Sequence, residues 1–357
     1  MYSLKFTSLL IVTVFLVGTI TITPSFQSAE AVKPTTPAFN SKFCTTTLGG
    51  AWTGKTSTCT ISGSSTITSS FTIPAKATLT IGSSGSILIN SFSTLTNFGT
   101  ITVANTGGFG IVNSIGSYLT NSGTITLANN FGYGLSNSGI VNNNSGGIIN
   151  VGVSYGIFNS IDGRVFNSGT VTITNSYNGY PGIDNRGFII NNSGGIITVA
   201  NSGDISSGIT TGVDGFLLND GAITITNSGV ESFGIGGNLS NSGTIIVANS
   251  GDSSAGIGTN NLGNSGTITI TNSGVDSYGI TINFALALIN TGPITVSNTG
   301  VGSYGIWNAG TIGNSDTITV SNTGVGSYGI YNTNTITNTG IICGSGTAFG
   351  YSLSPCI

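Results

Sequence analysis

The sequence contains no histidine, and only 5% of its residues are charged. Without histidine the chain lacks the side chain whose pKa lies closest to neutral, and it has no Ser–His or Cys–His arrangement for nucleophilic catalysis. The formal net charge is −3, and no basic cluster is present that could neutralise several phosphates on one face. These absences argue against an enzyme and against a nucleic-acid partner.

Proline is also scarce, with 7 residues, whereas glycine is abundant, with 57 of 357 residues. Disordered chains are usually highly charged and poor in β-branched residues, but this chain is weakly charged and rich in Ile, Val and Thr. The composition therefore predicts an ordered all-β protein with enough apolar side chains to form a core.

Residues 1–31 have the features of a signal peptide. Lys5 supplies a weak positive region, an apolar run extends from Leu9 to Ile22, and Ala29-Glu30-Ala31 forms a small-x-small cleavage site. An uncleaved anchor is the weaker interpretation, because a membrane-spanning helix needs about twenty apolar residues. We therefore expect an extracellular or cell-surface chain with no membrane span after cleavage.

From residue 99 onward a short strand motif recurs at intervals of 22 to 26 residues. Copies include GTITV at 99–103, GTITL at 123–127, GTITI at 266–270 and DTITV at 316–320. A long period without helical segments is typical of a solenoid. The prediction is a single-stranded right-handed parallel β-helix of about 11 coils of about 24 residues, with three short strands per coil. Residues 32–98 form an N-terminal segment and cap with irregular strands, residues 99–342 the repeats, and residues 343–357 a C-terminal cap.

Four cysteines in an exported chain predict two disulfides. The ends of a long solenoid lie too far apart for bridged Cα atoms, which must approach within roughly 7 Å. We therefore expect Cys44–Cys59 at one end and Cys343–Cys356 at the other. A metal site at these cysteines is not expected, because their spacings are long and histidine is absent.

The run LTNSGTITL at 119–127, with its later copies, resembles the Asn- and Gly-rich repeats of parallel β-helix surface proteins. These are adhesin-like and autotransporter-passenger-like members of the pectate-lyase-like superfamily. The resemblance implies the fold and a structural or adhesive role. It does not imply pectate-lyase activity, because neutral residues and Thr occupy the sheet that carries charged residues in those enzymes.

Asparagine recurs at three places in each coil, where its amide can bond to the amide one coil above or below. One column follows the first strand, a second precedes it, and a third, partial column ends the second strand. The first comprises Asn105, Asn129, Asn175, Asn201, Asn227, Asn249, Asn272, Asn298 and Asn322. The second comprises Asn97, Asn121, Asn144, Asn167, Asn192, Asn219, Asn241, Asn264, Asn290, Asn314 and Asn338. The third comprises Asn113, Asn137, Asn159, Asn185, Asn308 and Asn332. We interpret all three as structural ladders.

Three sequons begin at Asn143, Asn191 and Asn238, each beside a corner asparagine. They are candidate N-glycosylation sites, and we expect them to be exposed.

An aromatic residue recurs two positions before an inward Ile, with gaps at Ser207 and Ala255. It predicts either an internal stack or a partly exposed stripe able to stack on sugar rings. In the second case Tyr278, Tyr304 and Tyr328 are candidate glycan-stacking residues.

Acidic residues occupy one turn on four consecutive coils: Asp204, Glu231, Asp252 and Asp276. They predict either a Ca²⁺ site or a solvated loop that keeps a weakly charged surface soluble. No other cofactor is expected.

These patterns favour a secreted or cell-surface structural or adhesive protein without catalytic activity, whose partners are surface or extracellular-matrix components, including glycans. The alternative is a module that binds glycan or Ca²⁺. Two minor alternatives remain. Outward Thr pairs such as Thr124 and Thr126 resemble the ranks of ice-binding β-solenoids, but they are interrupted. Asp162 and Asp184, each near an arginine, would suit an enzyme acting on polysaccharide.

Overall fold

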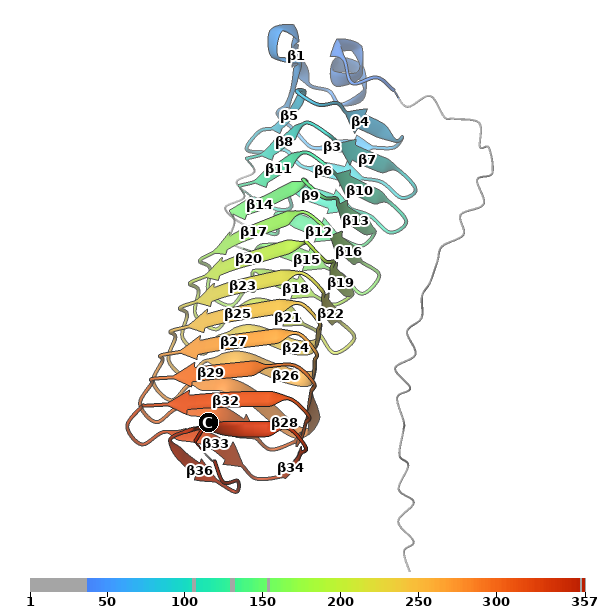
Figure 1. Ribbon diagram of the computed structural model, residues 1–357. Helices are drawn as coiled ribbons and strands as arrows, with labels where there is room; N and C mark the ends of the chain where they lie inside the picture. Colours follow the sequence, from blue (N-terminus) through green and yellow to red (C-terminus); the bar gives the residue numbers. More distant parts are fainter. Residues whose placement is uncertain (1–36, 105–106, 129–131, 153–154, 354, 357) are drawn as a thin grey trace, which may run out of the picture. The chain divides into compact units, whose positions relative to one another are not determined.

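The computed structural model describes residues 37–104, 107–128, 132–152, 155–353 and 355–356, and the predicted signal peptide lies outside them. The chain is an all-β solenoid of stacked parallel strands, with about 12 turns of about 24 residues and three strands per coil. In Figure 1 the near strands run from right to left while successive coils descend, so the coil is right-handed. No helix in the described part is long and apolar enough to span a membrane.

The coils stack as three ladders of strands. The first ladder is a 14-stranded sheet that begins with an antiparallel pair and continues in parallel. It comprises β1 (Ala51–Thr53), β2 (Thr58–Ile61), β5 (Thr78–Ile81), β8 (Thr100–Val103), β11 (Thr124–Leu127), β14 (Ile148–Gly152), β17 (Thr170–Asn175), β20 (Ile196–Asn201), β23 (Ala222–Asn227), β25 (Thr244–Asn249), β27 (Thr267–Asn272), β29 (Ile294–Asn298), β32 (Thr317–Asn322) and β35 (Ile341–Ser345).

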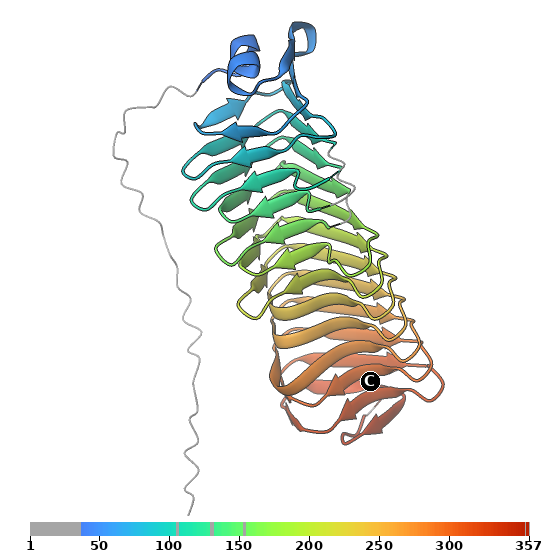
Figure 2. The same ribbon diagram turned by 180° about the vertical axis from the view of Figure 1, so that it is seen from behind.

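The second and third ladders form the 22-stranded sheet on the far side (Figure 2). The second ladder contains β3 (Ser65–Ile67), β6 (Ile87–Ile89), β9 (Ile111–Asn113), β12 (Leu135–Asn137), β15 (Ile157–Asn159), β18 (Ile183–Asn185), β21 (Ser207–Thr211), β30 (Tyr304–Asn308), β33 (Tyr328–Asn332) and β36 (Thr347–Phe349). The third contains β4 (Phe71–Ile73), β7 (Thr94–Asn97), β10 (Tyr118–Asn121), β13 (Ile140–Asn143), β16 (Arg164–Asn167), β19 (Phe188–Asn191), β22 (Phe216–Asn219), β31 (Thr311–Asn314) and β34 (Thr335–Asn338). Three strands belong to both ladders: β24 (Phe233–Asn241), β26 (Ala255–Asn264) and β28 (Tyr278–Asn290).

We number the corners by the strand they follow, so the second corner joins the second and third strands of a coil and the third corner leads to the next coil. The regular coils begin earlier than the sequence repeat does. Strand β2 pairs in parallel with β5, and β5 pairs with β8 in the register of the later coils. The solenoid geometry thus extends into residues 58–98, where the sequence suggested only irregular strands, and this accounts for the additional turn.

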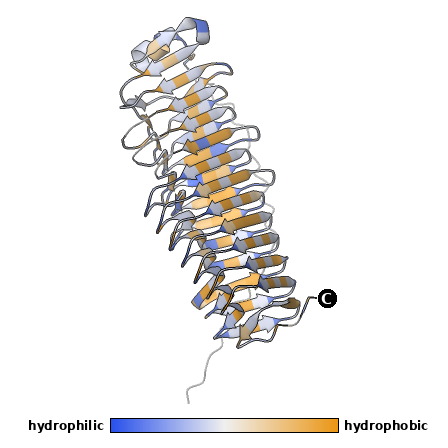
Figure 3. Cartoon of the chain, turned by 90° about the vertical axis from the view of Figure 1, so that its left-hand side faces the viewer, coloured by the Kyte–Doolittle hydropathy of each residue, from blue (hydrophilic) through white to orange (hydrophobic). Residues whose placement is uncertain are grey.

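Alternating side chains build the core. In the first-ladder strands alternate Ile, Val or Leu residues are buried, as at Ile125 and Leu127, while the residues between them, most often Thr, lie on the outer face. Because equivalent positions stack in register, bands of similar hydropathy run down the coils in Figure 3. A continuous apolar column therefore fills the interior.

A glycine follows the aromatic position of the coils, and a side chain at this glycine would be directed into the interior. A Cβ atom on Gly234 would lie 2.5 Å from both the Gly256 carbonyl oxygen and Val247 Cγ1. Gly234 has no positive φ, so the requirement comes from close packing of the two sheets and not from backbone conformation.

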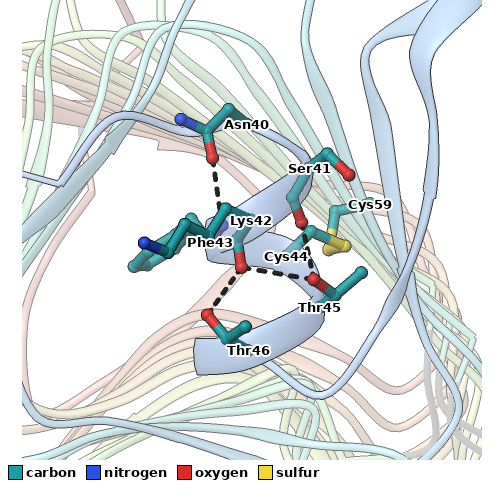
Figure 4. Close-up of a disulfide and its surroundings, with 8 residues drawn as sticks. All are labelled: Asn40, Ser41, Lys42, Phe43, Cys44, Thr45, Thr46 and Cys59. Carbon is teal, nitrogen blue, oxygen red and sulfur yellow. Dashed lines mark hydrogen bonds between the residues drawn. A yellow bond between two sulfur atoms is a disulfide. The ribbon is translucent and has the colours of Figure 1, made fainter.

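The N-terminal end is closed by a helical turn, η1 (Phe43–Thr47), and by the predicted disulfide. Cys44 and Cys59 are joined, with their Cα atoms 5.6 Å apart, and both are buried. Asn40 accepts a hydrogen bond from the Phe43 amide at 3.0 Å, which fixes the start of the turn (Figure 4). A second short turn, η2 (Gly54–Thr56), joins β1 to β2.

The C-terminal end is closed by the second predicted disulfide, Cys343–Cys356. The chain that it secures brings Leu353 against the core, close to Gly329. Both expected disulfide pairings are therefore confirmed, and each covers an end where a solenoid would otherwise expose unpaired strand edges and apolar side chains.

Candidate functional site

The most regular feature of the described residues is an asparagine ladder at the third corner, which is buried from Asn97 to Asn314 and ends at the exposed Asn338. In each bond the side-chain amide nitrogen of one Asn donates to the side-chain oxygen of the Asn one coil later, at 2.7–2.8 Å. The members are Asn97, Asn121, Asn143, Asn167, Asn191, Asn219, Asn241, Asn264, Asn290, Asn314 and Asn338.

Two positions in this ladder correct the sequence interpretation. The members are Asn143 and Asn191, whereas Asn144 and Asn192, assigned from the sequence, lie one residue outside it and bond to serines of the previous coil. In an Asn-Asn pair, spacing alone does not say which amide faces inward. The expectation that the sequons at Asn143 and Asn191 are exposed is consequently wrong, since these side chains are 1% and 0% exposed. Asn238 is half-buried and donates to the carbonyl oxygens of Val213 and Gly215.

A second asparagine ladder occupies the second corner, but it is interrupted. Side-chain hydrogen bonds of 2.7 Å link Asn113, Asn137, Asn159 and Asn185 in turn. A hydrogen bond of the same length links Asn308 to Asn332. Between these segments the paired positions are Thr211, Gly237, Thr259 and Ile282.

The backbone changes in three of the four coils that lack the corner asparagine. The strands β24, β26 and β28 continue through the second corner as runs of 9, 10 and 13 residues. In the coils that retain Asn, its amide also donates to a carbonyl of the third strand in the next coil, as from Asn159 to Phe188 at 3.2 Å. That bond ties the corner to the neighbouring coil. The coil of Thr211 lacks the asparagine but keeps two separate strands, β21 and β22, so fusion is confined to the next three coils.

The first corner carries an asparagine column that is less regular. The side-chain hydrogen bonds that link Asn201, Asn227, Asn249 and Asn272 lengthen along the column from 3.2 to 3.4 Å. The predicted members Asn105 and Asn129 lie outside the described residues. Beside it runs a buried serine ladder that the sequence interpretation missed. The backbone N–H of Ser232 donates a hydrogen bond to Ser254 Oγ at 3.0 Å, and the backbone N–H of Ser277 donates to Ser303 Oγ at 3.0 Å. The signal was the Ser that precedes the aromatic position in the later coils, as in Ser232-Phe233 and Ser277-Tyr278.

The aromatic column faces outward, so of the two expectations the exposed stripe is correct. Tyr278, Tyr304 and Tyr328 are half-buried, and their rings stack with centroids 5.2 and 5.5 Å apart and planes within 9°. Trp307 and Tyr331 pack edge-on against this stack. Burial, followed by the neighbouring tyrosines, raises the pKa of Tyr304.

Earlier coils carry a second aromatic group on the same face. Tyr133 lies 3.5 Å from a carboxylate oxygen of Asp184, which forms an ion pair with Arg186 at 3.2 Å. Burial and then the Asp184 charge raise the pKa of Tyr133 to about 12. The Arg186 guanidinium also lies 5.1 Å from the centre of the Phe158 ring. Asp184 is thus engaged in structural contacts.

A groove with a volume of about 620 Å³ lies between the two aromatic groups, over the fused strands. Its floor includes Gly236 and Gly258, and Phe233, Tyr278 and Trp307 line it. The groove is open because small residues, Ser207 and Ala255, take the place of the aromatic residue in two coils. Both coils also lack the corner asparagine.

The four acidic residues do not form one column. Glu231 and Asp276 have left-handed backbone with φ of 53° and 50°, whereas Asp204 and Asp252 precede the residues at that position. The carboxylates of Asp204 and Asp252 accept backbone hydrogen bonds from Val230 and Val275 at 2.9 and 2.8 Å. Across the described ranges no group of three or more His, Cys, Asp or Glu side chains is placed where it could hold a metal ion.

The outer face of the first ladder carries the predicted Thr array. Thr100 pairs with Thr124, and Thr102 with Thr126, but the next coil has Ile148 and Asn150 at these positions. Exposed Ile196 and Ile246 interrupt it further on. The array is real but irregular.

No known protein-family model matches this chain, and no curated protein is significantly similar to it.

Proposed function

We propose that this chain is an exported, non-catalytic β-solenoid that serves as a structural or adhesive element at the cell surface. The observation that carries the proposal is the unbroken asparagine ladder at the third corner, from Asn97 to Asn338, closed by a disulfide cap at each end. Buried and mutually bonded amides make successive coils depend on one another, and the caps fit an oxidising compartment.

Two further features support a role in contact. The resemblance of the repeats to adhesin-like parallel β-helices points to the same class of protein. The outward stripe of tyrosines offers large, rigid contact surfaces whose ordering costs little conformational entropy.

Labelling of the native protein on producing cells tests the proposal. Antibodies against the folded chain should label intact, unpermeabilised cells, and the signal should survive a high-salt wash if the chain is anchored by more than surface charge. A cytoplasmic protein detected only after permeabilisation serves as the control. Labelling that appears only after permeabilisation would refute the proposal.

A further inference from the structure

The groove over the fused strands has three aromatic surfaces at different angles. The Phe233 ring lies against Gly258, where a Cβ atom would sit 2.6 Å from two ring carbons. Tyr278 and Trp307 meet edge-to-face, with centroids 6.4 Å apart and planes at 71°. Phe233 is 42% exposed, and Tyr278 and Trp307 are half-buried, so each ring keeps part of its surface open to a ligand.

The polar groups of the groove are neutral with one exception. Thr210, Thr281, Asn260 and Asn283 contribute hydroxyl and amide groups, and Glu231 is the one charged residue among those that line it. No lysine or arginine lines it. Such a surface can bond to hydroxyl groups and present ring faces to C–H groups, but it places no positive charge against an anion.

The shape of the groove suits a chain more than a single small molecule. Its lining residues come from the coils of Ser207, Phe233, Ala255, Tyr278 and Trp307, and coils repeat at about 4.8 Å, so it extends for roughly 20 Å along the solenoid axis. The strands beneath it are paired on both sides, with register shifts at Gly237 and Thr259, so no free strand edge is available for a peptide to add as a further strand.

We propose that this groove binds a neutral, linear carbohydrate chain along the solenoid axis, with sugar rings against Phe233, Tyr278 and Trp307. The inference rests on the proposed adhesive function and names its ligand class. Acidic sugars are disfavoured, because Glu231 repels them and no cation compensates. The ligand occupies the place where the aromatic column lapses, so the tyrosine stack becomes one wall of the site.

Titration calorimetry on the purified mature chain tests this with three probes: cellohexaose, mannohexaose and the hexamer of galacturonic acid. At least one neutral hexasaccharide should bind, and the acidic one should not. Phe233→Ala should weaken binding by about tenfold or more, because a partly exposed aromatic ring that the ligand would cover is lost. The matched control is Phe109→Ala, which removes a ring of similar exposure, 46%, from the same column outside the groove and should change affinity by less than about twofold.

A second variant fills the groove without disturbing the fold, so that a loss of binding can be separated from a loss of folding. Gly236 has no positive φ, and the nearest heavy atoms to a Cβ there lie 4.0 Å away, so Gly236→Leu should fold normally and abolish binding. Failure of both neutral hexasaccharides to bind, equal losses in Phe233→Ala and Phe109→Ala, or preference for the acidic hexamer would each overturn the proposal. These measurements use purified protein, so they stand or fall independently of where the chain resides on cells.

Discussion

The backbone takes two different paths at the second corner. The coils from Asn113 to Asn185 turn sharply at asparagines linked in a ladder, whereas β24, β26 and β28 pass the same position as continuous strands. The core beneath is alike in both, since Ile157 and Ile257 are equally buried. The corner asparagine thus does not determine whether a coil forms. In three of the four coils that lack it, the second and third strands are continuous, and the groove lies over these strands.

The largest effect should come from breaking the ladder in the region that has it. Asn159→Ala removes the acceptor of Asn137 and the donor to Asn185, leaving two buried polar groups without their ladder partners. At about 1–3 kcal/mol for each group, the loss in unfolding free energy should be roughly 2–6 kcal/mol. Urea unfolding measures the loss, and hydrogen exchange should show it concentrated in the adjacent coils.

The control for this loss is Asn144→Ala, which removes an exposed amide beside the ladder at the third corner. Its cost should stay within about 0.5 kcal/mol. Equal costs for Asn159→Ala and Asn144→Ala would mean that the ladder does not stabilise the coils.

A smaller effect should separate two glycines of the fused strand β24. Gly234→Ala places a methyl group 2.5 Å from Val247 Cγ1 in the interior and should cost about 1–3 kcal/mol through overpacking. Gly236→Ala, two residues along on the outer face, meets nothing closer than 4.0 Å and should not destabilise. Thermal unfolding of the pair distinguishes steric exclusion from a general requirement for glycine, which predicts equal losses.

Extending the ladder should have a still smaller effect. The amide of Asn185 donates to the Phe216 carbonyl, and Thr211 follows it in the register. Thr211→Asn would supply the next ladder oxygen and should raise the unfolding free energy by about 1 kcal/mol. Thr210→Asn, one position away on the outer face, should produce no gain. A loss in Thr211→Asn would show that the fused coils exclude the corner residue sterically.

The smallest effect concerns the pH dependence of stability and Tyr133, which lies in the coils that have an asparagine at the second corner. The folded-state pKa of Tyr133 is about 12 and its ordinary value is 10.0, so the folded state binds this proton more tightly. The resulting stability is present below pH 10 and is lost as the pH rises toward 12. In a spectroscopic titration of tyrosinate, Tyr133→Phe should remove a late-titrating step. Retention of that step in the variant would assign it to another tyrosine, such as Tyr304.

Much of this architecture follows from local pattern. The alternation in GTITV predicts which side chains point inward, and the cysteine positions predict the pairing once a solenoid separates the ends. The aromatic stripe was open to two interpretations, because a residue two positions before an inward Ile can be covered or exposed depending on the neighbouring coil. The groove was not predicted, since it depends on small residues from several coils lying next to one another.

The sequence by itself determined the fold, the period of the coils and the closure of both ends, because each is encoded within one repeat or one cysteine pair. Only the tertiary structure decided which member of an Asn-Asn pair enters the ladder, that Asp204 and Glu231 occupy different positions of their turns, and that Gly234 is required for space. Those outcomes depend on distances between coils, and such distances are fixed by stacking and not by the order of residues within a coil.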